Sequence, residues 1–456
     1  ERKAERRERY TKAVEQLGDE KSPIRMGGVY TLVGLVDEWL EDESIEKYED
    51  RLKEGQVIIN NLCAYIRSPF TLASHYDELM QDTPDADGIY KDNQQEFYTD
   101  KATLDSEADV RLSIIKEIHD RIQGPDKNTP GAWSDFEYDF SGSTFFYPID
   151  LTNSYYAKPI NFSGSTYQDE VRFDGSVYKD EADFGSSIYK SWATFDGSTY
   201  TGWVGFNCST YQSWADFSNS TCQSEVYFSD STYKGKADFS GSTYQNEVYF
   251  SYSTYQSEAD FSDSIYQGKA DFSDSTYRGW ADFRNSAYQG RAGFTDSTYQ
   301  NEVYFSGSTY EDKADFSGSI FCGDVYYGKD RYNSNFSRFT DCTPQFSNEN
   351  SHQNTLFGSP NNNFIVDIDK GYPINLNSEG LPLGCKFLTS EQKKYLEDKF
   401  QEIGKTKNKF REVKDTEGNA ILVNTPLSLN GEIRVWREKV TTVKAEDNTA
   451  PEKEDN

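Results

Sequence analysis

The sequence predicts a mainly-β solenoid between an N-terminal α-helical domain and a small C-terminal α+β cap. A large apolar residue, aromatic in all cases but one, stands at every eleventh position from Phe140 to Tyr327. A second such series runs from Phe145 to Tyr332, five residues after the first, and is broken in its middle only by Cys222. Hydrophobic residues make up 35% of the chain but aromatic residues make up 15%, and disordered chains are poor in aromatics. These observations predict an aromatic core built by stacking short repeats.

The repeat unit joins a five-residue block, A/V-D-F-S-x, to a six-residue block, S-T-Y-x-x-x. In each block a small residue lies two positions before the aromatic one, so both side chains point to one side of an extended segment. The Ser of the second block recurs without exception from Ser143 to Ser319. Ser, Gly, Asp and Asn fill the remaining positions and favour a turn after each short strand. A chain that turns every five or six residues and always buries the same two positions coils into a solenoid.

This pattern, over about 139–333, resembles the pentapeptide-repeat family. The resemblance implies a right-handed quadrilateral β-helix with four short faces in each coil. The sixth residue in alternate blocks departs from the family's five-residue unit. If four faces still make a coil, one coil takes about 22 residues, bulges at two opposite corners, and recurs about 8.7 times between Phe140 and Tyr332.

The segment 1–135 is predicted to be an α-helical domain. Apolar residues follow Ser22-Pro23 at helical spacing, and the pattern recurs over 109–118; both segments resemble the second helix of a HEAT-type pair. The apolar segment 57–66 is a third helix candidate, and 67–105 is predicted to be a long polar excursion.

The N-terminal segment extends the resemblance, which then covers about 9–333. Arg9-Tyr10-Thr11-Lys12 and the Gly-Gly-Val-Tyr-Thr-Leu run after Arg25 are similar to the region that follows the transmembrane helices in actinobacterial, particularly corynebacterial, pentapeptide-repeat proteins. The resemblance implies a membrane-proximal domain at the cytoplasmic face of the cell membrane, with its anchor upstream of this chain. Six cations against three glutamates between Glu1 and Lys12 agree with such a flank, although a solvated helix start explains them as well.

Beyond residue 335 the period fails, and 336–444 is predicted to be the C-terminal cap. A helix is expected over 389–403, where Thr389 and Gln392 can form a capping box. Three of its apolar residues share one face: Leu396, Phe400 and Ile403. This helix is expected to cover the open end of the solenoid, because terminal caps are required there.

The last part of the chain carries two further expectations. A hairpin is predicted from Phe410 to Val423, with Gly418-Asn419 at its turn. The segment 445–456 has five acids and one Lys, which predicts a disordered tail.

Charge and residue content argue against several classes of function. The net charge of −30 argues against direct nucleic-acid binding, because phosphate contacts need clustered cations. The three His and six Cys are scattered, and no phosphate-binding glycine loop or nucleophile–base pair is evident. The sequence therefore predicts a non-enzyme with no cofactor, no catalytic residue and no metal site, in a reducing compartment.

Outward positions of the repeat are the candidates for function. With about 22 residues per coil, four acids are predicted to stack in one column: Asp216, Asp238, Asp260 and Asp282. Four tyrosines are included in the candidate partner surface, two on the opposite face and two that continue the acidic column: Tyr227, Tyr249, Tyr304 and Tyr326. Like charges at strand spacing repel, so the acids form either a functional surface or a set of side chains that bond nearby turn amides.

Tryptophans mark the corners. Trp192, Trp214 and Trp280 are separated by multiples of one coil, and Trp203 lies on the opposite side. Exposed aromatics in a line are candidates for a partner surface. The alternative is that they pad the bulged corner against the next coil.

Three hypotheses for function remain. The first is a non-catalytic protein-interaction scaffold, the cytoplasmic part of a membrane-anchored protein. The second is an acidic DNA mimic acting on DNA gyrase or another type II topoisomerase, since some members of the resembled family are similar to B-DNA in width and charge. The segment 138–333, with 27 acids and 13 bases, is compatible with it. The third is an envelope-associated structural assembly protein. The partner's identity and the oligomeric state are left open.

Overall fold

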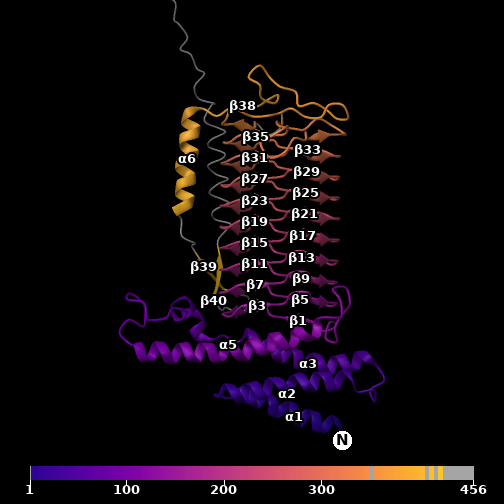
Figure 1. Cartoon of the computed structure of the whole chain (residues 1–456), viewed down its shortest axis with the longest axis vertical. Helices are drawn as coiled ribbons and strands as arrows, with labels where there is room; N and C mark the ends of the chain where they lie inside the picture. The colour runs from indigo at the N-terminus through magenta and orange to yellow at the C-terminus, as the bar shows by residue number, and fades with distance from the viewer. Residues whose placement is uncertain (1, 349–353, 406–409, 415–419, 425–456) are drawn as a thin grey trace, which may run out of the picture. The chain divides into compact units, whose positions relative to one another are not determined.

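The chain folds as a parallel β-solenoid of about nine turns, with helices before it and a small α/β region after it (Figure 1). The structure, a computed structural model, describes residues 2–348, 354–405, 410–414 and 420–424. The chain divides into two compact units, 1–225 and 226–456, which are described separately. The predicted fold class is confirmed.

Helices make up the first part of the first unit. They are α1 (Arg2–Leu17), α2 (Ser22–Leu40), α3 (Tyr48–Arg67), the 3₁₀ helix η1 (Thr71–His75), α4 (Tyr76–Leu79) and α5 (Gln94–Ile122). The three helices expected from the sequence are confirmed, and each is longer than predicted. The long excursion predicted over 67–105 is wrong in part, because α5 already begins at Gln94. Asn93 caps it there, accepting a hydrogen bond from the Glu96 amide at 3.1 Å.

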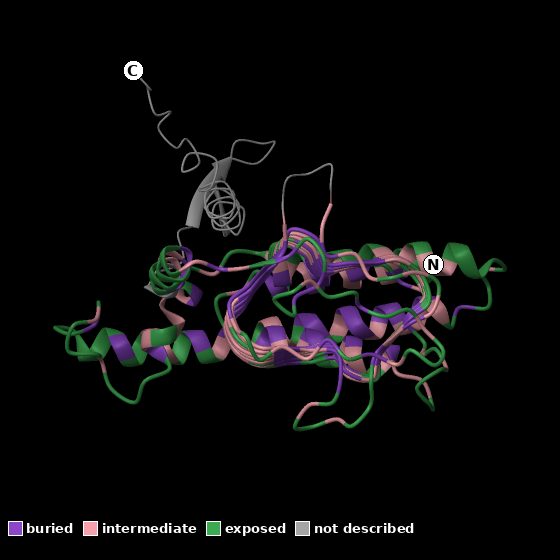
Figure 2. Cartoon of the chain, turned by 90° about the horizontal axis from the view of Figure 1, so that it is seen from above, coloured by how far each residue is buried: buried purple, intermediate pink, exposed green. Residues whose placement is uncertain are grey.

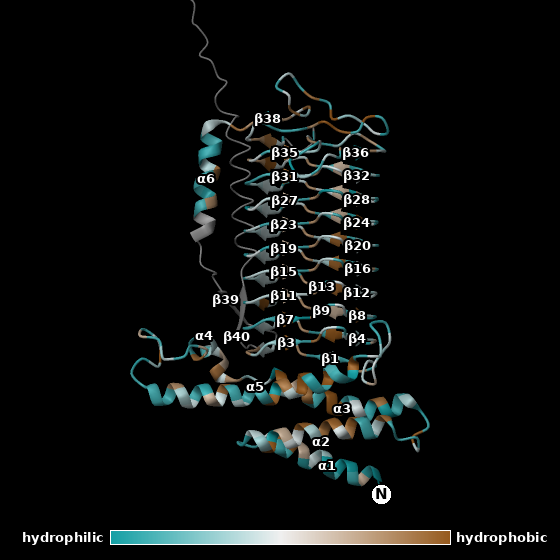
Figure 3. Cartoon of the chain, in the orientation of Figure 1, coloured by the Kyte–Doolittle hydropathy of each residue, from teal (hydrophilic) through white to brown (hydrophobic). Residues whose placement is uncertain are grey.

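The helices pack against one another and close the first coil. The C-terminal half of α5 carries most of the helix's buried apolar residues, and its N-terminal half is more hydrophilic (Figure 3). Gly28 lets α2 approach α1 closely, since a Cβ there would lie 2.8 Å from the Ala13 carbonyl oxygen. After α5 the chain buries Trp133, and Ser134 accepts a hydrogen bond from the Ala157 amide of the first coil at 2.9 Å.

The cations of α1 are largely paired within the unit. The distances are 2.5 Å for Arg6–Asp42, 2.8 Å for Arg9–Glu38, 3.8 Å for Arg7–Glu54 and 2.8 Å for Lys12–Glu8. Among the helices that the structure describes, none has the length and apolar character needed to cross a bilayer.

Strands of two residues form four parallel faces, and every fourth strand belongs to the same face. In the first unit, face 1 runs from β1 (Tyr138–Asp139) to β13 (Val204–Gly205), and face 2 from β2 (Thr144–Phe145) to β14 (Thr210–Tyr211). Face 3 runs from β3 (Ile149–Asp150) to β15 (Ala215–Asp216), and face 4 from β4 (Tyr155–Tyr156) to β16 (Thr221–Cys222). Paired residues such as Tyr138 and Ile160 are 22 positions apart, which confirms the predicted coil length.

The second unit repeats this arrangement. The first and last regular strands of its faces are β17 (Val226–Tyr227) and β33 (Ala314–Asp315), β18 (Thr232–Tyr233) and β34 (Ile320–Phe321), β19 (Ala237–Asp238) and β35 (Val325–Tyr326), and β20 (Thr243–Tyr244) and β32 (Thr309–Tyr310). Three later strands extend the faces: β36 (Arg338–Phe339), β37 (Leu356–Phe357) and β38 (Lys386–Phe387).

Aromatic stacks fill the inside of the coils, where buried residues gather (Figure 2). Phe184 stacks on Phe206 with 5.2 Å between ring centroids, and Tyr189 on Tyr211 with 4.6 Å. In these stacks, nine buried tyrosine hydroxyls find no hydrogen-bond partner among the described residues: those of Tyr156, Tyr167, Tyr178, Tyr200, Tyr255, Tyr277, Tyr288, Tyr310 and Tyr327. The buried serines that recur from Ser143 to Ser319 form hydrogen bonds with the backbone and not with these tyrosine hydroxyls. Ser176 Oγ, for example, accepts from the Ser154 amide at 3.1 Å and donates to the Leu151 carbonyl at 3.1 Å.

One corner residue of each eleven-residue unit is left-handed. It stands between the two blocks and has φ between 53° and 76° from Gly142 to Gly318. Gly, Asn and Asp occupy most of these positions, as expected for this conformation. Ser186, Cys208 and Tyr252 are the exceptions.

The last member of the predicted second aromatic series, Tyr332, is wrong. Tyr332 does not continue the core but lies on the surface, 61% exposed. Phe339 takes its place and stacks on Tyr310 at 4.7 Å, although the two are further apart in the sequence than one regular coil. The extra residues form a surface loop, 328–337, in which Asp330 holds the amides of Tyr332 and Asn333.

The C-terminal region adds helix α6 (Ser390–Lys405) and an end cover. The capping box is confirmed, with Gln392 Oε1 accepting from the Thr389 amide at 2.9 Å. The expectation that α6 covers the open end is wrong: its Leu396 and Phe400 pack on Ile320 and Leu356, along face 2 (Figure 1). Segments between α6 and the last coil cover that end instead.

Phe346 shows this end cover directly, since it stacks on Phe316 of the last regular coil at 5.2 Å. The predicted hairpin strands are confirmed as β39 (Phe410–Lys414) and β40 (Ala420–Asn424), an antiparallel pair. The hairpin's turn, the side chain of Ile403 and the tail 445–456 lie outside the residues described.

Candidate partner surface

Trp192 and Trp214 form a pair at one edge of face 3 in the first unit. Each stands immediately before a strand of this face, β11 (Ala193–Thr194) and β15. Trp192 is 51% exposed, and Trp214 packs edge-on against it with 6.1 Å between ring centroids. Trp214 is only half-buried, but its Nε1 is buried and has no acceptor in the residues described. Trp214 therefore supports Trp192, which is the exposed member of the pair.

The other two tryptophans are half-buried, so the expected line of exposed indoles is wrong. Trp203 lies over Gly205 of the strand that follows it, where a Cβ would come within 2.6 Å of the indole ring. Trp280, in the second unit, packs edge-on against Tyr304 at 6.2 Å.

The tyrosines of the candidate surface also differ from the expectation. Tyr304 is 1% exposed and its hydroxyl donates to Glu302 at 2.5 Å. It stacks on Tyr326 at 5.2 Å, and the Arg284 guanidinium lies 5.1 Å from its ring. Tyr304 is buried because side chains from adjacent coils and the 328–337 loop cover it. The alternation of residues along its own strand does not predict this burial.

Tyr227 and Tyr249 stack on one another at 4.9 Å on face 1 of the second unit, and both are half-buried. The Lys269 ammonium lies 5.2 Å from the Tyr249 ring and 2.8 Å from Asp271. This tyrosine pair therefore belongs to a network of cation–π contacts and ion pairs on that face.

The acidic column bonds turn amides, as the alternative interpretation proposed. In each member Oδ1 accepts from the backbone NH two residues later, at 3.0 or 3.1 Å, for Asp216, Asp238, Asp260 and Asp282. Lys236 pairs with Asp238 at 2.9 Å, and Arg284 Nε donates to Asp282 at 2.8 Å. These acids stabilise corners, and cations offset part of their charge.

Sequence reasoning missed a second pair of acids, Asp174 and Asp196, at the other edge of face 3. They follow Phe173 and Phe195, at a position where most coils have Ser. Burial, together with the carboxylate of Asp174, raises the pKa of Asp196 to about 6. Oδ1 of Asp174 is buried and receives no hydrogen bond from the donor groups in the described ranges. A departure from the repeat in two successive coils was the signal that could have revealed this pair.

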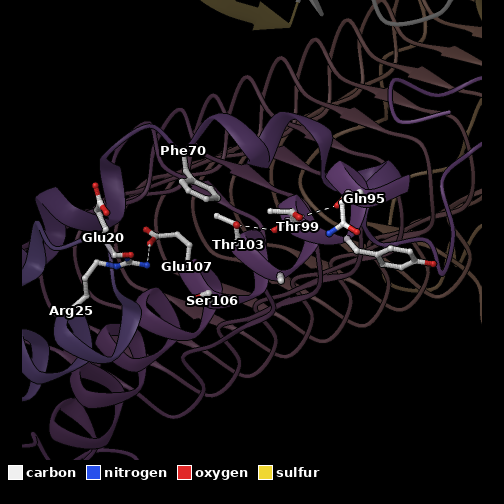
Figure 4. A pocket seen from close by; sticks show the side chains of 10 residues that line it. Glu20, Arg25, Phe70, Gln95, Thr99, Thr103, Ser106 and Glu107 are labelled. Atoms are coloured by element: carbon white, nitrogen blue, oxygen red, sulfur yellow. Dashed lines mark hydrogen bonds and ion pairs between the residues drawn. The ribbon is translucent and has the colours of Figure 1, made fainter. Parts of the chain in front are cut away.

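A cavity of about 610 Å³ lies along the hydrophilic half of α5 (Figure 4). Thr99 and Thr103 on its wall donate their hydroxyl protons to carbonyls four residues earlier, at 2.9 and 2.8 Å. At one end Arg25 pairs with Glu107 at 3.1 Å, and Glu107 also accepts from Arg111 at 2.7 Å. Its polar groups are largely engaged with one another, so the cavity lacks a nucleophile poised beside a base.

Metal and thiol chemistry find no assembled site in the part of the chain that the structure describes. No group of three or more His, Cys, Asp or Glu side chains is placed there to hold a metal ion. All six cysteines are free thiols, and burial raises the pKa of the Cys63 and Cys385 thiols to about 12.

The chain matches no family model, no curated protein and no solved structure. By its fold, the chain is a β-solenoid protein with helical and α/β flanking regions.

Proposed function

We propose that this protein is a non-catalytic scaffold of the pentapeptide-repeat type that binds a protein partner through face 3 of its first unit. One observation carries the proposal. The inward positions of the coils are nearly uniform, while the outward positions of face 3 change from coil to coil: Asp150, Arg172, Thr194 and Asp216. A uniform core with a varied surface is what a repeat protein uses to display a binding site.

Trp192 is the best anchor on this face. Its indole is half-exposed, and Trp214 holds it from one side. Tryptophan is enriched among the few residues that dominate binding energy, because a large rigid ring loses little entropy when a partner covers it.

The bonding of the acids favours the scaffold over the DNA mimic. A mimic needs a row of free carboxylates, whereas Asp238 and Asp282 are paired with Lys236 and Arg284. The tether at a membrane and the role in envelope assembly stay predictions.

Site-directed photo-crosslinking tests the proposal. A photoreactive phenylalanine derivative in place of Trp192 is expected to give one discrete protein adduct in a lysate of the source organism. The same derivative in place of Trp203, which is half-buried on face 1, is the matched control and should give none. Identical adducts from both positions, or no adduct at either, would contradict the proposal.

A further inference from the structure

We propose that face 3 of the first unit binds a basic segment of its partner, placing an apolar side chain on Trp192 and a Lys or Arg at the Asp174–Asp196 carboxyl pair. This inference rests on the proposed function and adds the chemistry of the partner.

The geometry of the face supports a single bound segment. The tryptophans and the two aspartates lie on opposite sides of the same strands: Trp192 stands directly before β11, and Asp196 stands in the turn that follows it, four residues later. Four residues span at most about 13 Å, and an α-helix with its side chains is about 10–12 Å wide. Both edges continue in an adjacent coil, because Trp214 lies one coil after Trp192 and Asp174 lies one coil before Asp196. The face can therefore seat one helix or one extended segment between an apolar edge and an acidic edge.

The charge of the face selects a cationic occupant. Four carboxyl groups surround its outward surface: Asp150, Asp174, Asp196 and Asp216. Among the residues described, two cations lie at this surface: Arg172, 3.6 Å from Asp150 and 3.4 Å from Asp174, and Lys127, whose ammonium donates to the carbonyl of Gly197 next to Asp196. The four carboxyl groups still outnumber them. Burial of Asp196 raises its pKa, and the neighbouring carboxylates of Asp174 and Asp216 raise it further. An ammonium or guanidinium group placed here would favour the ionised form of the pair by attraction to its carboxylates.

The departure from the repeat supports a binding role. In other coils the Ser at this position donates to the Asp two residues before it, as Ser240 does to Asp238 at 2.6 Å. The two aspartates give up this corner bond and place two carboxyl groups in successive coils, where like charges repel. Local choices that work against the fold are characteristic of functional sites.

Peptide titration tests the inference directly. The probes are two synthetic amphipathic peptides with the same Leu and Phe positions, one carrying Lys and the other Glu at all polar positions. The full chain at pH 7.5 and low salt is expected to bind the Lys peptide saturably, with a change in tryptophan fluorescence, and to bind the Glu peptide at least tenfold more weakly.

Variants assign the binding to this face. The double change Asp174→Asn and Asp196→Asn, and separately Trp192→Ser, should each weaken binding of the Lys peptide about tenfold. The matched control, Asp238→Asn with Asp260→Asn, removes the same charge from turn-bonded acids and should leave the affinity within twofold. Lowering the pH from 7.5 to 5 should also weaken binding, because Asp196 becomes protonated below about pH 6.

Several results would overturn the inference. They are absence of saturable binding of the Lys peptide, equal losses in the control variant, and saturable Ca²⁺ binding that the Asp174→Asn change abolishes. A partner that cross-links at position 192 but binds equally well after the aspartate changes and at high salt would also overturn the inference. That result would leave the scaffold proposal intact. A cooperative thermal unfolding transition, measured for each variant, is the control that the variant is folded.

Discussion

At the scale of single residues, the left-handed corner limits which side chains the repeat tolerates. A non-glycine residue in this conformation costs roughly 1–2 kcal/mol, less for Asn or Asp, whose side chains bond locally. Ser186 has φ of 57° and Gly197 has φ of 62°, one eleven-residue unit further along the chain. Ser186 is exposed, and a Cβ on Gly197 would meet nothing within 4 Å. The two positions therefore isolate backbone strain from packing.

The change Ser186→Gly is expected to raise the free energy of unfolding by about 1 kcal/mol, because it relieves strain at a corner where the side chain is solvated. The reverse change, Gly197→Ala, should lower it by about the same amount. Guanidinium unfolding of both variants beside the parent measures the two shifts. Shifts of the same sign would show that the corner conformation is not the cause.

At the scale of elements, alternation and period were enough to predict the faces and the coil register, and the Thr389–Gln392 spacing was enough to predict the capping box of α6. They could not predict which outward aromatics are exposed. Tyr304 is covered because Arg284 and Trp280 reach it from other coils, and the sequence of its own strand does not contain that contact. The substitution of Phe339 for Tyr332 was missed for a similar reason. A longer loop resets the register there, and a fixed period does not reveal an insertion.

Deleting whole coils tests the register. Removal of 238–259 takes out one coil and keeps every face aligned, so the fold should survive with a modest loss of melting temperature. Removal of 238–248 instead exchanges faces 1 and 3, and faces 2 and 4, for all later coils. It should destabilise the second unit much more, because stacked pairs such as Tyr304 and Tyr326 would then lie on the wrong face for the cap. Equal losses in thermal unfolding would refute the four-faced coil.

At the scale of the whole molecule, the tyrosine core makes stability depend on alkaline pH. Burial raises the pKa of twelve core tyrosines above 10: Tyr138, Tyr156, Tyr167, Tyr178, Tyr189, Tyr200, Tyr255, Tyr266, Tyr277, Tyr288, Tyr310 and Tyr327. In the unfolded chain tyrosine ionises near pH 10, so above that pH the unfolded state binds fewer protons than the folded one. Stability is therefore fully present below pH 10 and falls as the pH rises further.

The expected loss is steep. Each such tyrosine contributes about 1.4 kcal/mol per pH unit, so twelve together contribute about 16 kcal/mol per unit. The protein should keep its stability from pH 7 to 9 and unfold within about one unit above pH 10. Circular dichroism and tyrosinate absorbance, followed together, should change at the same pH. Ionisation of most tyrosines while the β-sheet signal persists would contradict the buried-hydroxyl core.

The end cover of the solenoid sets the length of what would otherwise be an open-ended polymer. Every coil presents a complete row of amides and carbonyls to the next, so a stack of such coils contains no internal instruction to stop. In the second unit Phe346 lies over the last regular coil and its segment pairs with the exposed edge, with the Phe316 amide donating to Gln345. In the first unit, helices and the Ser134 carbonyl contact the edge of the first coil. The chain thus carries segments that cover the hydrogen-bonding edges of its own solenoid. Since a fibre grows by adding strands to such edges, covering them prevents further copies from adding to the stack.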